Sequence, residues 1–487
     1  MAPPPERFEQ LMNRLKSVFQ SGIRVLMSNW ITVLGSVFVM VSMVFILAGT
    51  LSEMIDQGKN PYQGLITFTV LPAILLAGII LIVAGIIRSR REVIERPGLI
   101  IDFSIPRHRN LIIFFVVTST LSFIVLSVGS FKAYEYTESV PFCGTICHSV
   151  MTPEYTAYQA GSHARVPCAQ CHIGPGAPWW VRSKLSGLRQ LVSVFTGEYS
   201  RPISTPIANL RPARDTCEQC HWPEVFHGKK LISYERIGAE GSVTDPIVSA
   251  VILHIGGYNK RTQRNVGIHW HISADNRVEY LIANDKRTKI KRVRVIRSDG
   301  TRKEWENSKA PEPPAGTAYR VMDCIDCHNR PAHRFKDPGD GLDELLLSGQ
   351  IDTSIPGIRK LVYGAITADY KTQDEAELAI RNAMHDLYER EASDRKDIYP
   401  EQSIATAVKL YRSNVFPEMG IRWNTYVNHL GHIKSKGCFR CHNDNMTTKD
   451  GTELSSDCDL CHDVLADEEA ASTLDPKIME MITESHH

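Results

Sequence analysis

The chain has 487 residues, of which 43% are hydrophobic and 22% are charged, and its formal net charge at neutral pH is +1. A chain of this length can form more than one domain. The near-zero net charge argues against nucleic acid as a partner, because nucleic-acid-binding proteins normally present a basic surface.

Three uncharged apolar runs lie in the first 131 residues, at 30–51, 65–87 and 111–131. Each is as long as the roughly 20 residues that a helix needs to cross the hydrocarbon core of a bilayer. The sequence therefore predicts an α-helical anchor with three transmembrane helices over residues 30–131, with the lipid bilayer as a partner. The first run is too long and too far from the N-terminus to be a cleaved signal peptide.

Basic residues predict the orientation of this anchor, because loops rich in lysine and arginine stay in the cytoplasm. The segment between residues 52 and 64 carries one basic residue, Lys59. The N-terminal segment and the loop between the second and third runs are strongly basic. The first carries Arg7, Arg14, Lys16 and Arg24, and the second carries Arg88, Arg90, Arg91, Arg96, Arg107 and Arg109. We expect residues 1–29 and this loop to be cytoplasmic and everything after Phe131 to lie outside the cytoplasm.

The rest of the chain repeats a cysteine–histidine motif. All twelve cysteines fall into six pairs, and a histidine follows each pair directly. The motifs are Cys143, Cys147 and His148; Cys168, Cys171 and His172; Cys217, Cys220 and His221; Cys324, Cys327 and His328; Cys438, Cys441 and His442; and Cys458, Cys461 and His462. C-x-x-C-H is the attachment site of c-type haem, in which two thioethers hold the porphyrin and the histidine is the proximal ligand of the iron.

The motifs therefore predict six covalently bound haem c groups, all on the side predicted to lie outside the cytoplasm. The first motif differs from the other five because three residues, not two, separate its cysteines. Other cysteine chemistries fit less well. A zinc site does not require a histidine directly after every second cysteine, a thioredoxin-like pair occurs once rather than six times, and two-residue spacings are unsuited to structural disulfides in a large domain.

The motifs divide the region after the anchor into segments. Residues 132–222 form a module with haems 1–3, 321–336 hold the fourth haem, and 431–487 hold haems 5 and 6 with an acidic tail. We expect a largely irregular and helical multihaem domain with little regular structure. Residues 223–320 form a β-rich insertion with a small antiparallel sheet at about 246–308, and residues 337–430 form a helical insertion in which Thr372 to Glu375 is a capping box.

Further histidines can fill the distal position of each iron, as in six-coordinate haems that transfer electrons. The stronger candidates are His163, His269, His271, His333 and His432; the weaker ones are His227, His254 and His429, and His385 fits an amphipathic helix. His269 and His271 would share one face if they lie on a strand. Met151 is an alternative axial ligand for the first haem or a neighbouring haem, or else a packing residue.

An apolar stripe with helical spacing follows the second motif, at Val181, Leu185, Leu188, Val192 and Phe195. Basic side chains and two tryptophans accompany it, as in helices that lie in a membrane interface. A core helix of a soluble domain would show the same pattern.

The segment from Cys143 to His221 resembles the NapC/NirT family of membrane-anchored quinol dehydrogenases. The most specific parts are Ser162-His-Ala-Arg-Val-Pro-Cys-Ala-Gln-Cys-His-Ile-Gly-Pro-Gly176 and Asp215-Thr-Cys-Glu-Gln-Cys-His-Trp222, and Asp323-Cys-Ile-Asp-Cys-His-Asn-Arg-Pro331 fits the fourth haem of the same module. Simple members carry four haems and one span. The chain is similar to the larger multihaem inner-membrane relatives of bacteria that export electrons.

This resemblance implies oxidation of menaquinol or ubiquinol from the quinol pool and transfer of single electrons to periplasmic cytochromes or to another subunit of a membrane complex. It also implies that Met151 ligates the first haem and that Lys184 contacts the quinol. Glu138 and Asp215 are the candidate proton acceptors, followed by Glu135 and Glu154. Two other functions remain open, namely a non-catalytic electron-conducting subunit of a larger respiratory complex and a periplasmic oxyanion reductase.

Overall fold

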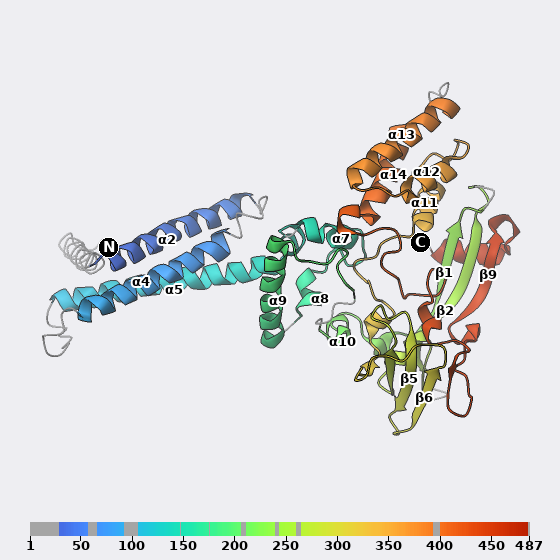
Figure 1. Cartoon of the computed structure of the whole chain (residues 1–487), viewed down its shortest axis with the longest axis horizontal. Coiled ribbons are helices and arrows are strands. Elements are labelled where there is room, and N and C mark those ends of the chain that lie inside the picture. Colours follow the sequence, from blue (N-terminus) through green and yellow to red (C-terminus); the bar gives the residue numbers. More distant parts are fainter. Residues whose placement is uncertain are drawn as a thin grey trace, which may run out of the picture. The chain divides into compact units, whose positions relative to one another are not determined.

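The computed structural model of the chain describes residues 29–56, 66–91, 106–146, 148–174, 176–205, 211–238, 243–259, 264–392 and 400–485. The chain divides into two compact units, residues 1–148 and residues 149–487. Figure 1 labels the helices and strands of both units.

The first unit is helical. It contains α2 (Trp30–Asp56), a π-helical turn (Ile66–Val70), α4 (Leu71–Arg91), α5 (Pro106–Thr137) and α6 (Val140–Thr145). Helices α2 and α4 approach closely because glycines line their contact: a Cβ added at Gly35 would lie 2.6 Å from the carbonyl oxygen of Gly78. Small residues allow this kind of backbone approach between helices in lipid. The side-chain amide of Asn29 also donates a 2.8 Å hydrogen bond to the carbonyl oxygen of Gly85.

The prediction of three membrane-spanning helices is wrong. Among the described residues, two helices are long and apolar enough to cross a membrane, Trp30–Gly49 in α2 and Leu71–Arg88 in α4. The third predicted span, 111–131, lies inside α5. An uncharged run shows only that a segment is apolar. Here the run is the middle part of a longer helix, Pro106–Thr137, whose ends carry Arg107, Arg109, Lys132 and Glu135.

Most of the basic residues that predicted the orientation of the anchor lie outside the described residues. These include Arg7, Arg14, Lys16, Arg24, Lys59 and Arg96.

The second unit begins with short helices that surround the early motifs. They are α7 (His148–Gln159), α8 (Cys168–His172), α9 (Ala177–Thr196) and α10 (Ala213–Cys217). Helix α9 has Pro178 in its first turn and ends at Gly197, whose φ of 73° is left-handed. Glycine adopts this conformation at helix C-termini without steric cost.

Two antiparallel sheets follow. In one sheet, β2 pairs with β1, β3 and β9, and β9 lies on the edge of β2 opposite β1. The second sheet has the order β7-β4-β5-β6-β8. The strands are β1 (Gly228–Arg236), β2 (Ile247–Asn259), β3 (Arg264–Val266), β4 (Asn276–Ile282), β5 (Ile290–Arg297), β6 (Arg302–Asn307), β7 (Arg320–Val321), β8 (Met446–Thr447) and β9 (His462–Ala470). The sequence indicated strands between 246 and 308. It did not indicate β9, which begins at the last motif histidine. The acidic tail, for which the sequence left a helix or a loose segment open, contains helix α15 (Pro476–Ser485), whose Ile482 is buried in the core of the first sheet.

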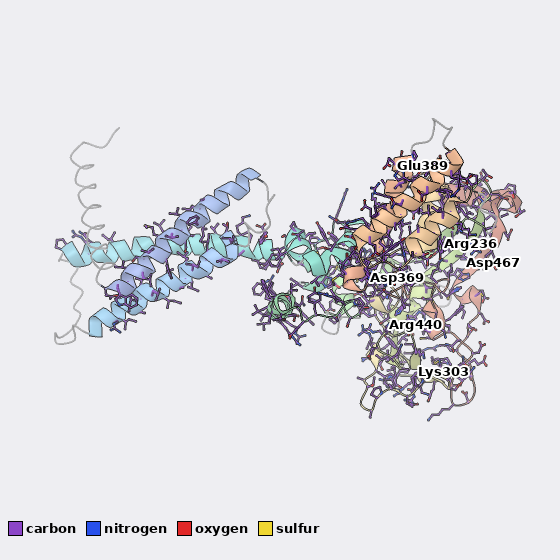
Figure 2. The ribbon with its side chains drawn as sticks, turned by 45° about the horizontal axis from the view of Figure 1, so that its top comes forward. Arg236, Lys303, Asp369, Glu389, Arg440 and Asp467 are labelled. Atoms are coloured by element: carbon purple, nitrogen blue, oxygen red, sulfur yellow. The ribbon has the colours of Figure 1, made fainter. Side chains whose placement is uncertain are left out.

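Four helices pack between the fourth and fifth motifs, and they appear side by side in Figure 1. They are α11 (Pro338–Leu347), α12 (Ile358–Thr367), α13 (Gln373–Ala392) and α14 (Pro400–Asn414). Their buried aliphatic side chains form one core that includes Met384 and Leu387 of α13. At the start of α13, the backbone N–H of Glu375 donates a 3.1 Å hydrogen bond to the hydroxyl of Thr372. Figure 2 labels Asp369, in the connection before α13, and Glu389, near the C-terminal end of α13.

Two leucines of α13 provide a matched test of this core. Leu387 is 3% exposed and Leu378 is 62% exposed. Leu387→Ala should lower the free energy of unfolding by about 2–5 kcal/mol, because it leaves a cavity in the core. Leu378→Ala should change it by less than about 0.5 kcal/mol. Denaturant unfolding followed by far-ultraviolet circular dichroism measures both values, and equal effects would show that Leu387 is not a core residue.

Candidate haem-binding sites

Each motif that the second unit contains is formed by a tight helical turn. Motif 2 is the helix α8 itself, and motifs 4, 5 and 6 include the 3₁₀ helices Cys324–Asp326, Gly437–Arg440 and Cys458–Leu460. In motifs 3, 4 and 5, the histidine N–H donates a hydrogen bond to the carbonyl oxygen of the first cysteine, at 2.8, 2.8 and 3.1 Å. This turn holds both thiols and the histidine of a motif close together.

Four motif histidines face a second imidazole from a distant part of the chain. The ring centroids are 6.2 Å apart for His172 and His333, 6.1 Å for His221 and His163, 5.9 Å for His442 and His271, and 6.1 Å for His462 and His432. A metal–imidazole bond is about 2 Å long, and the ring centre lies about 1 Å behind the nitrogen, so two imidazoles on opposite sides of one metal have centroids about 6 Å apart. The four pairs fit this requirement for haem iron.

The fifth motif histidine of this unit, His328, lies near His269. Desolvation lowers the pKa of His328, and His269 and His221 lower it further by electrostatic repulsion. Of these two imidazoles, His221 already faces His163, so His269 is the candidate partner for the fourth motif.

Backbone carbonyl groups orient several of these imidazoles through Nδ1. The Nδ1–carbonyl distances are 3.3 Å for His163 and Pro331, 2.8 Å for His269 and Ile255, 2.9 Å for His271 and Ile268, 2.9 Å for His333 and Glu154, and 2.7 Å for His442 and Ser455. A histidine that donates from Nδ1 to a carbonyl presents an unprotonated Nε2, which is the usual arrangement of histidine ligands in metal sites.

The environment also favours the neutral form of these rings. Desolvation is the main cause that lowers the pKa of His271, and His442 and His269 lower it further, although the hydrogen bond to Ile268 acts in the opposite direction. Desolvation likewise lowers the pKa values of His172 and His432. A metal binds neutral imidazole, so these shifts favour ligation at neutral pH.

Consecutive motifs are neighbours from the second to the sixth. Desolvation raises the pKa of the Cys171 thiol, and the thiols of Cys217 and Cys220 raise it further. The third and fourth motifs meet through a side-chain hydrogen bond between Cys217 and Cys324. The thiols of later motifs are also close enough to raise one another's pKa values: Cys327 with Cys438 and Cys441, and Cys461 with Cys438. The five motifs thus form a continuous series in the order of the sequence.

An ion pair supports the His333 position. Arg330 donates to the Glu154 carboxylate at 2.7 Å and to the carbonyl oxygen of His333 at 2.7 Å. Its guanidinium also lies 4.0 Å from the centre of the Tyr426 ring. Glu154, which the sequence suggested as a proton acceptor, is 14% exposed in this pair. Its side chain therefore anchors the segment that carries His333.

Two charged residues that lie between motif cysteines, Asp326 and Arg440, connect the fourth and fifth motifs. The sequence did not predict this role. Asp326 is 2% exposed and lies between Cys324 and Cys327. Its carboxylate receives hydrogen bonds from Tyr280, Arg287 and Arg320. Arg440, labelled in Figure 2, donates to the carbonyl oxygen of Asp326 at 2.6 Å. The only sequence signal was a charged residue in each spacer.

The other histidines have different surroundings. His269 and His271 lie on a 3₁₀ helix, Ile268–Ile272, so the expected strand is wrong, and the two rings are next to different motifs. His254 lies 3.1 Å from an Asp463 carboxylate oxygen and His385 lies 3.1 Å from Glu401. His227 is exposed. Burial, followed by the nearby charge of Arg440, lowers the pKa of His429 to about 4.

The first motif and the predicted quinol site are described in parts. Cys143 lies in α6, Cys147 and the side chain of His148 are outside the described residues, and Met151 lies in α7. In the first unit, Glu138 receives a hydrogen bond from Tyr134. In the second unit, the Lys184 ammonium lies 5.4 Å from the centre of the Trp180 ring, and Asp215 pairs with Arg211 at 3.3 Å.

Comparison with known proteins agrees with this arrangement. The family described as NapC/NirT cytochrome c family, N-terminal region, matches residues 105–205. Cytochrome c-type protein ImcH of Geobacter sulfurreducens is 41% identical over 450 residues, which cover 90% of this chain and 88% of that protein. The chain belongs to the NapC/NirT cytochrome c family. No solved structure matches it.

Family membership establishes the general character of the protein. It is a membrane-anchored c-type cytochrome that binds several haem c groups covalently and transfers electrons to partners. The two apolar helices of the first unit agree with a membrane anchor. The repeated Cys-His motifs have the form of haem c attachment sites, and the paired imidazoles described above fit the iron of such a haem.

The pairing of His271 with His442 can be tested by spectroscopy. His271→Ala removes one imidazole of the pair, so about one haem per chain should change from low-spin to high-spin. Electron paramagnetic resonance of the oxidised protein measures this change. The control is His385→Ala, on the surface of α13, which should leave the spectrum unchanged. An unaltered spectrum of the His271 variant would rule out this pairing.

Proposed function

We propose that the protein holds six haem c groups, one at each Cys-His motif. The proximal ligands are His148, His172, His221, His328, His442 and His462. Five distal ligands follow from the imidazole neighbours: His333 for His172, His163 for His221, His269 for His328, His271 for His442 and His432 for His462. Met151 is the proposed axial ligand for the first haem, by resemblance to the family motif.

We propose further that the protein oxidises menaquinol or ubiquinol at the periplasmic face of the inner membrane and passes electrons singly to periplasmic cytochromes or to another membrane subunit. The observation that carries this proposal is the continuous series of motifs in a membrane-anchored chain of this family. Bound haem c supplies one-electron redox chemistry. The absence of cysteine before residue 143 supports a periplasmic location for the motif-bearing region, because haem c is attached outside the cytoplasm.

The proposed quinol site uses three kinds of side chain. The Lys184 ammonium, near the Trp180 ring, would bind a quinol oxygen as a cation and hydrogen-bond donor. Oxidation of a quinol releases two protons, for which Glu138 and Asp215 are the proposed acceptors. Arg211, which pairs with Asp215 at 3.3 Å, would orient that carboxylate.

The two other candidate functions differ in what they require. An oxyanion reductase needs an iron with an open coordination position, whereas four motif imidazoles each face a second imidazole. A conducting subunit would use the same haem series but would receive its electrons from another polypeptide.

Haem content tests the first part of the proposal. A pyridine haemochrome assay combined with intact-protein mass should give six haems per chain. Replacing Cys143 and Cys147 by serine should reduce this number to five, because both thioethers of the first haem are lost. Five haems in the unchanged protein, with no loss in the variant, would show that the first motif is not an attachment site.

Stopped-flow reduction by a naphthoquinol tests the second part. Lys184→Ala should slow haem reduction by about 10-fold or more, because a positioned donor is lost from the quinol site. Lys303→Ala is the matched control, since the Lys303 ammonium also lies near a tryptophan ring, 5.1 Å from that of Trp305, on β6 (Figure 2). The control should react at the original rate. Full reduction by dithionite without reduction by quinol would favour the conducting subunit.

A further inference from the structure

Helix α9 presents an apolar stripe that the second unit leaves uncovered. Val181, Leu185, Leu188, Val192 and Phe195 are 49%, 66%, 61%, 54% and 82% exposed. These five residues define the α9 stripe. Val194, on the other side of the helix, packs against the cluster formed by Val150, Phe416, Met419 and Ile421. The helix is therefore attached to its unit by one face and presents the stripe outward, which excludes the core-helix interpretation.

Charged side chains border the α9 stripe. With about 100° of rotation per residue, Arg182 and Arg189 fall along one edge of the stripe and Lys184 along the other. Helix α9 contains no acidic residue. Long basic side chains at the edges of an apolar stripe can extend their charged ends toward lipid headgroups while their aliphatic parts contact the apolar layer.

Two tryptophans lie at the start of the helix next to these cations. The Arg182 guanidinium is 4.7 Å from the centre of the Trp179 ring, and the Lys184 ammonium is 5.4 Å from that of Trp180. Tryptophan is enriched at the level of lipid headgroups because its ring is apolar and its N–H is polar.

We propose that α9 lies in the plane of the membrane surface, with the α9 stripe in the boundary between headgroups and acyl chains and with its arginines against anionic headgroups. The apolar helices of the first unit keep the chain at a membrane, so the proposed surface is always available to this helix. The protein would then have a second membrane contact, within the haem-bearing unit and separate from the transmembrane anchor. This inference does not depend on quinol oxidation.

Spin labels on the two faces of α9 test this inference in the full-length haem-loaded protein. Leu188→Cys and Val192→Cys place a label on the stripe, and Gln190→Cys places the control label on the opposite face. The native cysteines are engaged by haem, and the unsubstituted protein measures any background labelling. The samples are liposomes of phosphatidylglycerol and phosphatidylethanolamine with the haems kept oxidised. A nitrogen-equilibrated sample of each variant measures the relaxation that the haem iron itself causes.

Power-saturation electron paramagnetic resonance then compares accessibility to oxygen, which dissolves in lipid, and to a nickel chelate, which stays in water. We expect the oxygen-to-nickel ratio to be several-fold higher at positions 188 and 192 than at position 190. Equal ratios with nickel access at all three positions would overturn the proposal. Protection of positions 188 and 192 from both reagents would also overturn it, because that result indicates a protein partner or a second copy of the chain.

Replacement of the basic border provides an independent arm. Arg182→Gln combined with Arg189→Gln should reduce the oxygen-to-nickel ratio at position 188 in anionic liposomes, since the attraction to headgroups is lost. The same pair of changes should have little effect in liposomes of phosphatidylcholine alone. A ratio at position 188 that is independent of both lipid charge and the arginines would contradict the proposed role of the basic border.

Discussion

The pairing of imidazoles, at a distance that suits one metal ion, is the interaction that constrains the second unit most. Each pair joins segments that are far apart in the chain, such as His172 with His333 and His271 with His442. When a metal binds both rings, its binding free energy stabilises the folded arrangement of both segments. The short helices and turns around the motifs have little apolar core of their own, whereas the helices α11–α14 and the two sheets have separate cores. The segment between β3 and β4 carries His269 and His271 to the motifs, whereas the helices α11–α14 carry none of the paired imidazoles.

Hydrogen bonds from the backbone and a few buried charges hold these ligands in position. The carbonyl of Ile255 in β2 orients His269, and the carbonyl of Glu154 in α7 orients His333. Asp326 and Arg440 occupy the spacers of neighbouring motifs and connect them directly. A change in any of these second-sphere groups alters the orientation or the electrostatic environment of a haem ligand without removing the ligand itself.

The sequence was informative where chemistry requires a fixed local spacing. The motif cysteines and histidines, the capped helix α13 and the family resemblance were all readable from short segments. The distal candidates could be named, but their partners could not, because His163 and His221 approach each other only through the folding of the intervening chain. The strand expected for His269 and His271 was wrong for a local reason: alternation alone does not distinguish a strand from a 3₁₀ turn. The number of spans was wrong because an uncharged run was taken as a spanning helix, whereas residues 111–131 are the middle of the longer helix α5.

The pairing of β9 with β2 has a consequence for the order of assembly. β2 is flanked on one edge by β1, which precedes it by a short connection, and on the other by residues 462–470, more than 200 positions later. Synthesis proceeds from the N-terminus, so one edge of β2 stays unpaired until almost the whole chain has been made. An open strand edge is prone to pair with other chains. Completion of the C-terminus therefore closes the most aggregation-sensitive surface of this sheet, and at the same time it brings the sixth motif, which ends at the first residue of β9, into place.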